Sequence, residues 1–293
     1  MALVGSTLAE LAELMTGHRV LVLTGAGCST GSGIPDYRDE RGDRKHPQPM
    51  TYQQFVGSEG ARQRYWARSA AGWMRIADAA PNPAHQAIAA LEAAGFVHGV
   101  ITQNVDGLHT RAGSRRVIDL HGRLDTVRCL ECGALTPRSE FQTRLLDRNI
   151  HLGSATIHTI APDGDARLTD LDYSSVAVPA CAGCGGILKP HVVFFGEGVP
   201  PARTAAAFER LDEADALLVV GSSLMVYSGY RFALAAARDS KPIAAVNVGR
   251  TRADDMIGLK VEAECGETLT ALARELREAP AAPVVNARAT AAP

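Results

Sequence analysis

The stretch VLTGAGCSTGSGIPDYRDE, residues 22–40, contains a nucleotide-binding turn with an unusual continuation. β-prone residues lead into Gly25-Ala26-Gly27, a turn that lets the backbone approach a pyrophosphate closely. A dinucleotide fingerprint has a third glycine three positions after the second, but Thr30 occupies that position and Pro35 ends any helix soon afterwards. No Asp or Glu ends a strand about 20 residues further on to hold a ribose. The stretch therefore predicts a dinucleotide site unlike that of an ordinary dehydrogenase, although a lone G-x-G is also common in plain tight turns.

Apolar runs around this turn predict a parallel sheet. They are rich in Val, Ile and Leu and do not alternate with polar residues, as is typical of strands covered on both faces. The predicted strands are His18–Thr24, Phe96–Thr102, Val117–Leu120, His191–Phe195, Ala216–Val220 and Pro242–Val248. Helices are expected from the Thr7 capping box to Gly17, from Asn82-Pro83 to Gly95, and over Ala202–Asp212 and Ser228–Asp239.

The composition is that of an ordinary soluble globular protein, with 46% hydrophobic residues, 21% charged residues and a formal net charge of −2. This balance gives no electrostatic case for nucleic-acid binding. No apolar run approaches the ~20 residues that span a bilayer, and the N-terminus does not resemble an export signal. We therefore expect a cytoplasmic protein, a monomer, without membrane or nucleic-acid partners.

Two C-x-x-C pairs predict a metal site. Cys129-Leu-Glu-Cys132 and Cys181-Ala-Gly-Cys184 are each followed directly by glycine, which suits the tight turn of a zinc knuckle. Four thiolates leave no open coordination position, so the expected Zn²⁺ is structural. Four unrelated reduced cysteines are the alternative. Cys28, alone at the glycine turn, is expected to pack in the core.

The predicted fold class is α/β, a Rossmann-like doubly wound parallel sheet with a smaller zinc-binding module and a helical module inserted. We expect the Rossmann-like domain over 1–37, 99–122 and 190–278, the helical module and cofactor loop over 38–98, the zinc-binding module over 123–189, and a disordered tail over 279–293.

Ligand-type residues follow five of the predicted strands, at the edge where α/β proteins bind ligands. Asn104 and Asp106 could hold a carboxamide and position a water or a ribose, and His121 is suited to general-base work. Small residues and an asparagine at 221–223 and 247–249 suit phosphate and ribose hydroxyls. Each segment has an ordinary alternative, a plain turn or a structural histidine, but their coincidence favours one shared site.

Together these stretches resemble the sirtuin family of NAD-dependent protein-lysine deacylases, over residues 7–276. The resemblance rests on Gly25–Arg38, Thr102–Asp106, His121-Gly122, the four cysteines, Lys189–Glu197, Gly221–Leu224 and Asn247. It implies NAD as co-substrate, one structural Zn²⁺, and acylated lysine in protein substrates as the partner. In this family the glycine turn leads into a flexible cofactor loop, which accounts for the missing helix.

The resemblance also assigns roles to residues. His121 and Asn104 are the expected catalytic residues. Contacts with NAD are expected from Gly25, Ala26, Gly27, Ser29, Ile34, Pro35, Asp36, Tyr37, Arg38, Gln103, Asn104, Val105, Asp106, Gly221, Ser222, Ser223, Asn247, Val248, Gly249 and Cys265. The extended segment expected to pair with the substrate backbone as an added strand comprises Val192, Val193, Phe194, Phe195, Gly196 and Glu197.

The implied chemistry has two stages. The acyl oxygen of the modified lysine attacks C1′ of the nicotinamide ribose as nicotinamide leaves, and a dry pocket favours this attack over hydrolysis of NAD. His121 then deprotonates a ribose hydroxyl, and the products are free lysine and an acylated ADP-ribose.

Departures from the family pattern leave the preferred acyl group open. Tyr37 replaces a commoner phenylalanine and Lys189 a frequent arginine, as in the class II branch of mitochondrial-type and bacterial members with weak deacetylase activity. Tyr65-Trp-Ala-Arg68 resembles the Tyr-x-x-Arg pair with which some sirtuins recognise acidic acyl chains such as succinyl. Arg68 would then pair with an acyl carboxylate, although an ordinary amphipathic helix explains the same residues.

Three other functions compete with this interpretation. A protein ADP-ribosyltransferase on the same scaffold would use the same pocket, so these residues separate the two poorly. A non-catalytic zinc-ribbon interaction protein would be expected to lack His121 or Asn104, and both are present. The missing ribose-binding acid disfavours an ordinary dehydrogenase.

Overall fold

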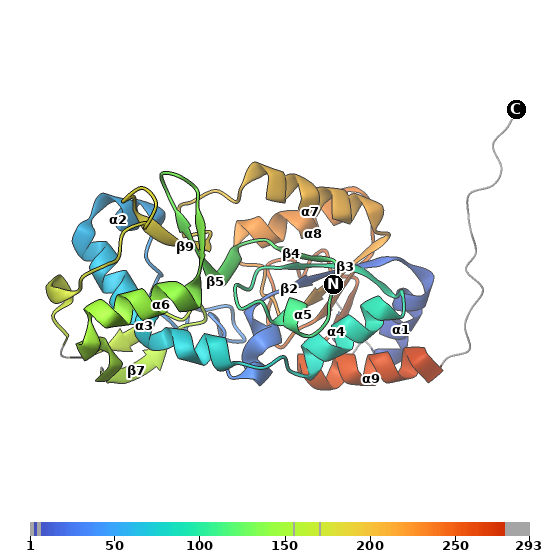
Figure 1. The fold of residues 1–293 in the computed structure, drawn as a ribbon. Helices are drawn as coiled ribbons and strands as arrows, with labels where there is room; N and C mark the ends of the chain where they lie inside the picture. Colours follow the sequence, from blue (N-terminus) through green and yellow to red (C-terminus); the bar gives the residue numbers. More distant parts are fainter. Residues whose placement is uncertain (1–2, 5–6, 155, 170, 279–293) are drawn as a thin grey trace, which may run out of the picture.

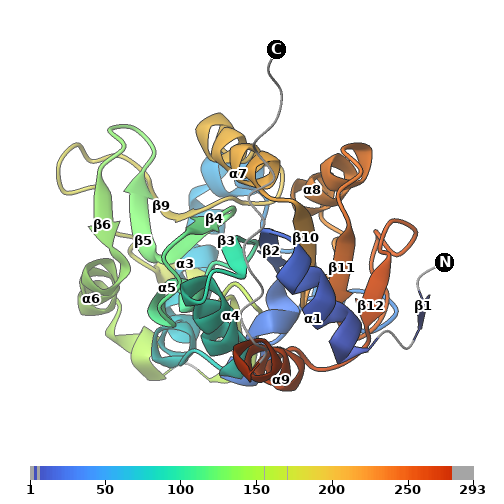
Figure 2. The ribbon, with the colours of Figure 1, turned by 90° about the vertical axis from the view of Figure 1, so that its right-hand side faces the viewer.

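A seven-stranded parallel sheet forms the larger lobe of the computed structural model, which describes residues 3–4, 7–154, 156–169 and 171–278. The larger lobe lies beside a smaller lobe (Figure 1). The strand order of the sheet is β1-β12-β11-β10-β2-β3-β4, which Figure 2 shows. The strands are β1 (Leu3–Val4), β2 (Val20–Thr24), β3 (Val97–Thr102), β4 (Val117–Asp119), β10 (Ala216–Val220), β11 (Ile243–Val246) and β12 (Leu259–Val261). The chain leaves β2 towards β3 on one side and later returns to β10 on the other, so the strand order reverses between β2 and β10. This confirms the predicted doubly wound sheet; the predicted tail at 279–293 lies outside the described residues.

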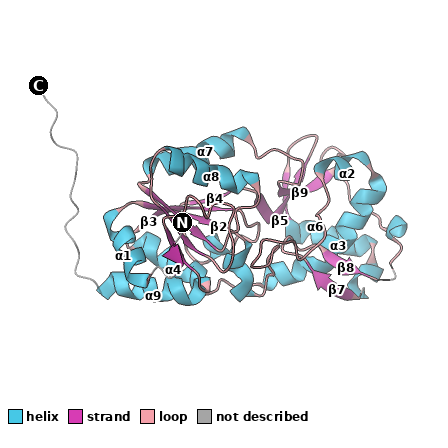
Figure 3. Cartoon of the chain, turned by 180° about the vertical axis from the view of Figure 1, so that it is seen from behind, coloured by secondary structure: helices cyan, strands magenta, loops and turns pink. Residues whose placement is uncertain are grey.

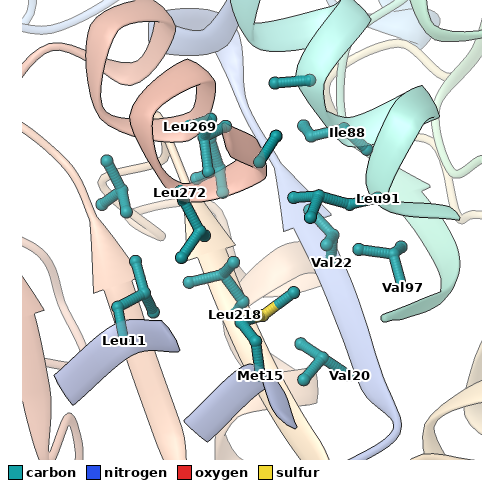
Figure 4. Close-up of a cluster of buried hydrophobic side chains, with 14 of the residues drawn as sticks. Leu11, Met15, Val20, Val22, Ile88, Leu91, Val97, Leu218, Leu269 and Leu272 are labelled. Atoms are coloured by element: carbon teal, nitrogen blue, oxygen red, sulfur yellow. The ribbon is translucent and has the colours of Figure 1, made fainter. Parts of the chain in front are cut away.

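Helices cover both faces of this sheet (Figure 2). One face packs against α1 (Leu8–Gly17), α4 (Pro83–Ala93) and α9 (Cys265–Glu278), and the other against α7 (Pro201–Glu213) and α8 (Tyr227–Arg238). Successive side chains of a strand point to opposite faces, so Val20 and Val22 of β2 lie in the first core and Leu21 and Leu23 in the second. Figure 4 shows the first core, where Leu11, Met15, Leu269 and Leu272 meet the strands.

Two helix starts follow the predicted capping chemistry. The Thr7 hydroxyl accepts from the Glu10 amide at 3.3 Å, and the Glu10 carboxylate accepts from the Thr7 amide at 2.6 Å. The Asn82 side chain caps α4, whose first residue is Pro83.

The smaller lobe combines the expected helical and zinc-binding parts around one core (Figure 3). Phe55 and Trp66 pack there together with Phe141 and Leu188. Its helices are α2 (Tyr52–Gly57), α3 (Glu59–Asp78), α6 (Arg138–Arg148) and the short helices η2 (Ile150–Ser154) and η3 (Tyr173–Ser175). Its strands are β5 (Gly122–Cys129), β6 (Leu135–Pro137), β9 (Leu188–Val192) and the hairpin of β7 (Ile157–Ile160) and β8 (Ala166–Leu168). The short helix α5 (Leu108–Arg111) borders the lobe. By contrast α4, expected within the 38–98 module, packs on the large sheet.

The predicted strand at His191–Phe195 was wrong in both place and partner. The strand is β9, which begins at Leu188 and pairs antiparallel with β5, and β5 also pairs with β6. An apolar run looks the same whether it is buried in a parallel sheet or between an antiparallel partner and a helical core. Lys189 and Pro190 are buried, but they interrupt the apolar run in the sequence, so the start of the strand at Leu188 was not predicted.

Helix α3 carries a glycine contact that predicts a stability difference. A Cβ at Gly72 would overlap the carbonyl oxygen of Gly164 in the β7–β8 hairpin, whereas the nearest atom to a Cβ at Gly60 is Ser58 Oγ at 3.8 Å. We expect Gly72→Ala to lower the free energy of unfolding by about 1–3 kcal/mol because the hairpin must move. Gly60→Ala in the same helix should raise it by about 0.5 kcal/mol. Urea denaturation measures both, and equal stabilities would contradict the contact.

Candidate functional site

A cavity of about 630 Å³ lies at the carboxyl ends of β2, β3 and β10, where the strand order reverses and the smaller lobe meets the sheet. This is the position at which open α/β sheets bind ligands. The predicted residues that line it are Gly25, Ala26, Gly27, Ser29, Ile34, Asp36, Tyr37, Arg38, Tyr65, Gln103, Asn104, Val105, Asp106, His121, Val192, Val193, Phe194, Phe195, Gly196, Glu197, Gly221, Ser222, Ser223, Asn247, Val248 and Cys265. Three predicted residues, Pro35, Arg68 and Gly249, are not part of its wall.

The glycine turn after β2 packs directly against the turn after β10. The Gly25 amide donates to the Val220 carbonyl at 3.1 Å and the Gly27 amide to Gly221 at 2.9 Å. A Cβ at Gly25 would lie 2.7 Å from Ser222 Cβ, so no larger residue fits there. At Gly25, Gly27 and Gly221 no side chain stands between the backbone and the cavity, which fits close approach of a pyrophosphate.

A short 3₁₀ helix follows the glycine turn, in place of the α-helix of an ordinary dinucleotide site. It is η1 (Ala26–Ser32), and it ends at Gly33 with a φ of 79°. Cys28 is fully buried in the core on this helix, as expected. The prediction that no regular helix follows the turn is therefore confirmed.

Asn104 is fixed over the glycine turn by two donated hydrogen bonds. Its side-chain amide donates to the Gly25 carbonyl at 3.0 Å and to Ser29 Oγ at 3.0 Å. Ser29 Oγ in turn donates to Asp106 Oδ2 at 2.7 Å, and Asp106 Oδ1 accepts from the Leu108 amide at 2.9 Å. The groups expected around nicotinamide thus form one rigid polar network.

His121 is held as a neutral base with one nitrogen free of a proton. Its Nδ1 lies 2.8 Å from the Gln103 carbonyl, which can only accept, so Nδ1 carries the hydrogen. In the neutral ring Nε2 is then an acceptor, and it receives the Ser228 hydroxyl at 2.8 Å. Burial lowers the pKa of His121 to about 4, although the bond to Gln103 opposes this shift and Arg203 and Arg231 add to it. At neutral pH the ring can accept a proton at Nε2.

The loop after η1 is held by contacts within the loop and with the segment after β11. Arg38 donates to the Gly42 carbonyl at 2.6 Å, and Lys45 binds Asp36 at 2.7 Å. The Arg250 amide donates to the Glu40 carbonyl at 2.8 Å, which ties the loop to the segment after β11. The order of this loop therefore depends on Arg38 and on the 247–250 segment together.

The segment after β9 runs beside His121. The Val193 amide donates to the His121 carbonyl at 2.7 Å. Glu197 Oε2 accepts from the Phe194 amide at 2.9 Å and from Lys189 Nζ at 3.0 Å. The buried Lys189 thus supports the expected peptide-binding segment, a role that its place in the motif did not indicate.

The acidic-acyl hypothesis places both Tyr65 and Arg68 at the acyl group, but Arg68 is not part of the cavity wall. Tyr65 lines the cavity and packs on Phe194, with ring centroids 5.2 Å apart. The Arg68 guanidinium pairs with Asp165 at 2.8 Å, a carboxylate of the chain itself.

Sequence reasoning missed several residues of the cavity wall. Among them are Glu40, Arg44, Lys45, Met50, Asp163, Asp165, Ser228, Arg231, Arg250 and Glu264. Ser228 could have been found, since it begins a predicted helix just after the Gly221–Leu224 turn. Asp163 and Asp165 carried no signal, because they lie in the turn-rich middle of the zinc-binding stretch.

The four cysteines of the C-x-x-C pairs come together away from this cavity. Their sulfur atoms lie within 4.8 Å of one another, with Cys129–Cys184 at 3.5 Å and Cys132–Cys181 at 3.8 Å. Zn–S bonds of about 2.3 Å at tetrahedral angles place sulfurs about 3.8 Å apart, so the group fits Zn²⁺. Gly133 and Gly185, which follow the pairs, both have a φ of 75°. Gly122, next to His121, pairs with Val192 of β9, and Cys129 pairs with Leu188, so four strand steps or roughly 13 Å separate them. The four thiolates leave no open coordination position, so the metal is structural.

Within the described ranges, none of the helices combines the length and apolar character required to cross a bilayer.

Comparisons with known proteins identify relatives of this chain in sequence and in structure. The Sir2 family model matches residues 25–228. NAD-dependent protein deacetylase 2 of Bradyrhizobium diazoefficiens is 60% identical over 264 residues, covering 90% of this chain and 96% of that protein. The mitochondrial NAD-dependent protein lipoamidase sirtuin-4 of Bos taurus is 50% identical, covering 89% of this chain and 84% of that protein. A solved complex of Sir2 with a p53 peptide and NAD⁺ superposes with a TM-score of 0.73 at 30% identity, covering 92% of this chain and 98% of that one.

Proposed function

This chain belongs to the Sir2 family, and we propose that it is an NAD-dependent protein-lysine deacylase. It would transfer the acyl group of a modified lysine to ADP-ribose and release nicotinamide. The observation that carries the proposal is the shared cavity. A neutral His121 with a proton-accepting Nε2 lies in the same cavity as the glycine turn and the Asn104 network.

NAD would be held along this cavity as a consumed co-substrate, and it supplies the ribose carbon that takes the acyl oxygen. The backbone floor at Gly25 and Gly221 suits the pyrophosphate, and Asn104 and Asp106 suit the carboxamide end. Burial raises the pKa of the Cys265 thiol to about 12, so this residue lines the cavity in its uncharged form.

The protein substrate would lie along the segment Val192–Glu197 as an added strand, with its modified lysine directed towards His121. The backbone of this segment is tied to His121 through the Val193 amide. Phe194 and Tyr65 provide an apolar wall for the lysine stem and the acyl group. Water exclusion at this wall favours acyl transfer over hydrolysis.

The test is nicotinamide release from NAD in the presence of acyl-lysine peptides. We expect an acetyl- or longer acyl-lysine peptide to stimulate release at least about 10-fold over the unmodified peptide. Labelled NAD should leave no label on unacylated protein. Acyl-independent release with label transferred to protein would instead show an ADP-ribosyltransferase.

A further inference from the structure

The β7–β8 hairpin contributes an acidic turn to the cavity wall beside Tyr65. Asp163 and Asp165 of this turn both line the cavity, although the turn is almost 100 residues from Tyr65 in the chain. Nothing in the catalytic arrangement around His121 uses either carboxyl group.

The turn is built to stay in place on helix α3. The Ala161 amide donates to the Asp165 carbonyl at 3.0 Å, and the Gly164 amide donates to Ala161 at 2.9 Å. Gly164 has a φ of 73°, and its carbonyl lies against Gly72 of α3 so closely that a Cβ there would overlap it. Two glycines therefore bring the turn into backbone contact with the helix that carries Tyr65 and Arg68.

Asp165 forms an ion pair with Arg68. Arg68 Nε lies 2.8 Å from Asp165 Oδ1 and 2.9 Å from the Ala166 carbonyl oxygen. The two side chains are only 29% and 20% exposed, so the pair is shielded from solvent. An acyl carboxylate entering the cavity would have to compete with a carboxylate that is already bound to this guanidinium.

Asp163 makes it unfavourable to bring another negative charge to this part of the cavity wall. The Asp165 amide donates to Asp163 Oδ1 at 3.2 Å. Burial raises the pKa of Asp163 and, together with the charge of Asp163, raises the pKa of Asp165 to about 7. Burial and mutual repulsion already disfavour the charged forms of these two carboxyl groups, so an incoming carboxylate would be disfavoured for the same reasons, whereas a neutral hydrogen-bond donor would find acceptor oxygens.

Arg44 is one of the cations that line the cavity, and it lies next to the expected peptide-binding segment. Its guanidinium carbon lies over the Phe195 ring, 5.4 Å from the centroid, on the peptide-binding segment. We therefore compare Arg44→Met with Arg68→Met.

We propose that the turn formed by Asp163, Gly164 and Asp165 determines the acyl preference of this enzyme. Asp165 occupies Arg68 from within the chain, so the site accepts acyl groups with an uncharged or hydrogen-bond-donating end and rejects dicarboxylic ones. The inference rests on the proposed deacylase function and reverses the role that the Tyr-x-x-Arg resemblance assigned to Arg68.

The experiment compares two lysine-modified peptides of equal size, one succinyl and one carrying the monoamide of succinate. The wild-type enzyme should use the amide at least about 10-fold better in kcat/KM, as expected for one charge-assisted contact. Asp165→Asn frees Arg68 and should shift the ratio about 10-fold towards succinyl. The double variant Asp165→Asn/Arg68→Met should lose that gain. Asp147→Asn removes the same charge from an exposed position of the same lobe and should keep the wild-type ratio.

A wild-type preference for the succinyl peptide, or an unchanged ratio in folded Asp165→Asn, would overturn the inference. Arg44→Met and Arg68→Met are each combined with Asp165→Asn. If the Arg44 change, rather than the Arg68 change, removes the gain in succinyl turnover, the inference also fails. Titration calorimetry with the same two peptides measures the preference without turnover. Absence of nicotinamide release with every acyl peptide would count against the proposed function, while the binding ratio would still decide the role of the turn. Should Asp165→Asn fail to fold, Gly72→Ala moves the turn without changing a charge and should lower the amide preference.

Discussion

His121→Ala should lose deacylation by about 10²–10⁴-fold while still exchanging free labelled nicotinamide into NAD. Nε2 of this ring is the proton acceptor of the cavity, fixed in the unprotonated form by the bond between Nδ1 and the Gln103 carbonyl. In the proposed reaction the proton is taken up after nicotinamide has left, so the earlier, reversible step does not need the imidazole. Acyl-lysine turnover and nicotinamide exchange, measured on the same preparation, separate the two steps.

Ser228→Ala is the matched control, because it removes the hydroxyl 2.8 Å from Nε2 and leaves the imidazole in place. We expect its deacylation rate to stay within about 10-fold of wild type. Equal loss of both reactions in a folded His121→Ala protein would make His121 a structural residue that shapes the cavity. Undiminished deacylation would remove it from the mechanism.

Much of this fold could be predicted from local sequence. The capping chemistry at Thr7 and Asn82 determined two helix starts, and continuous Val/Ile/Leu runs identified the central strands. The three-residue strand β12 was not predicted, because so short a segment carries no hydrophobic periodicity. β9 was misplaced because its pairing with β5 depends on a partner some 60 residues away.

The cavity was predictable where its residues follow strands. Parallel strands bring their carboxyl ends to one edge, so Gly25, Asn104, His121 and Ser222 had to converge once the sheet was correct. Arg68 shows where this reasoning ends. Its partner Asp165 lies on a hairpin whose position depends on a contact between two glycines, and no local pattern encodes that contact.

Removal of zinc should unfold the smaller lobe and abolish deacylation, although the metal lies far from His121. The cysteine pairs sit at the outer end of β5 and just before β9, and these strands lead to His121 and to the segment Val192–Glu197. Structural zinc contributes on the order of 10 kcal/mol to the folding of small metal sites. We expect Cys184→Ser to lose bound zinc, to lower the Tm by more than about 10 °C and to lose peptide-dependent nicotinamide release. Metal analysis, thermal melts and the peptide assay measure these effects.

Cys28→Ala is the control for loss of a cysteine as such, since Cys28 is buried in the core of the larger lobe. It should retain one zinc per chain, with only the moderate destabilisation of a small cavity, about 1–2 kcal/mol. The strands β5 and β9 transmit the effect of the metal, so its removal should weaken binding of the acyl peptide more than binding of NAD to the larger lobe. A zinc-free protein that melts normally and still binds the peptide would show that the lobe holds its shape through the core around Phe55, Trp66 and Phe141 alone.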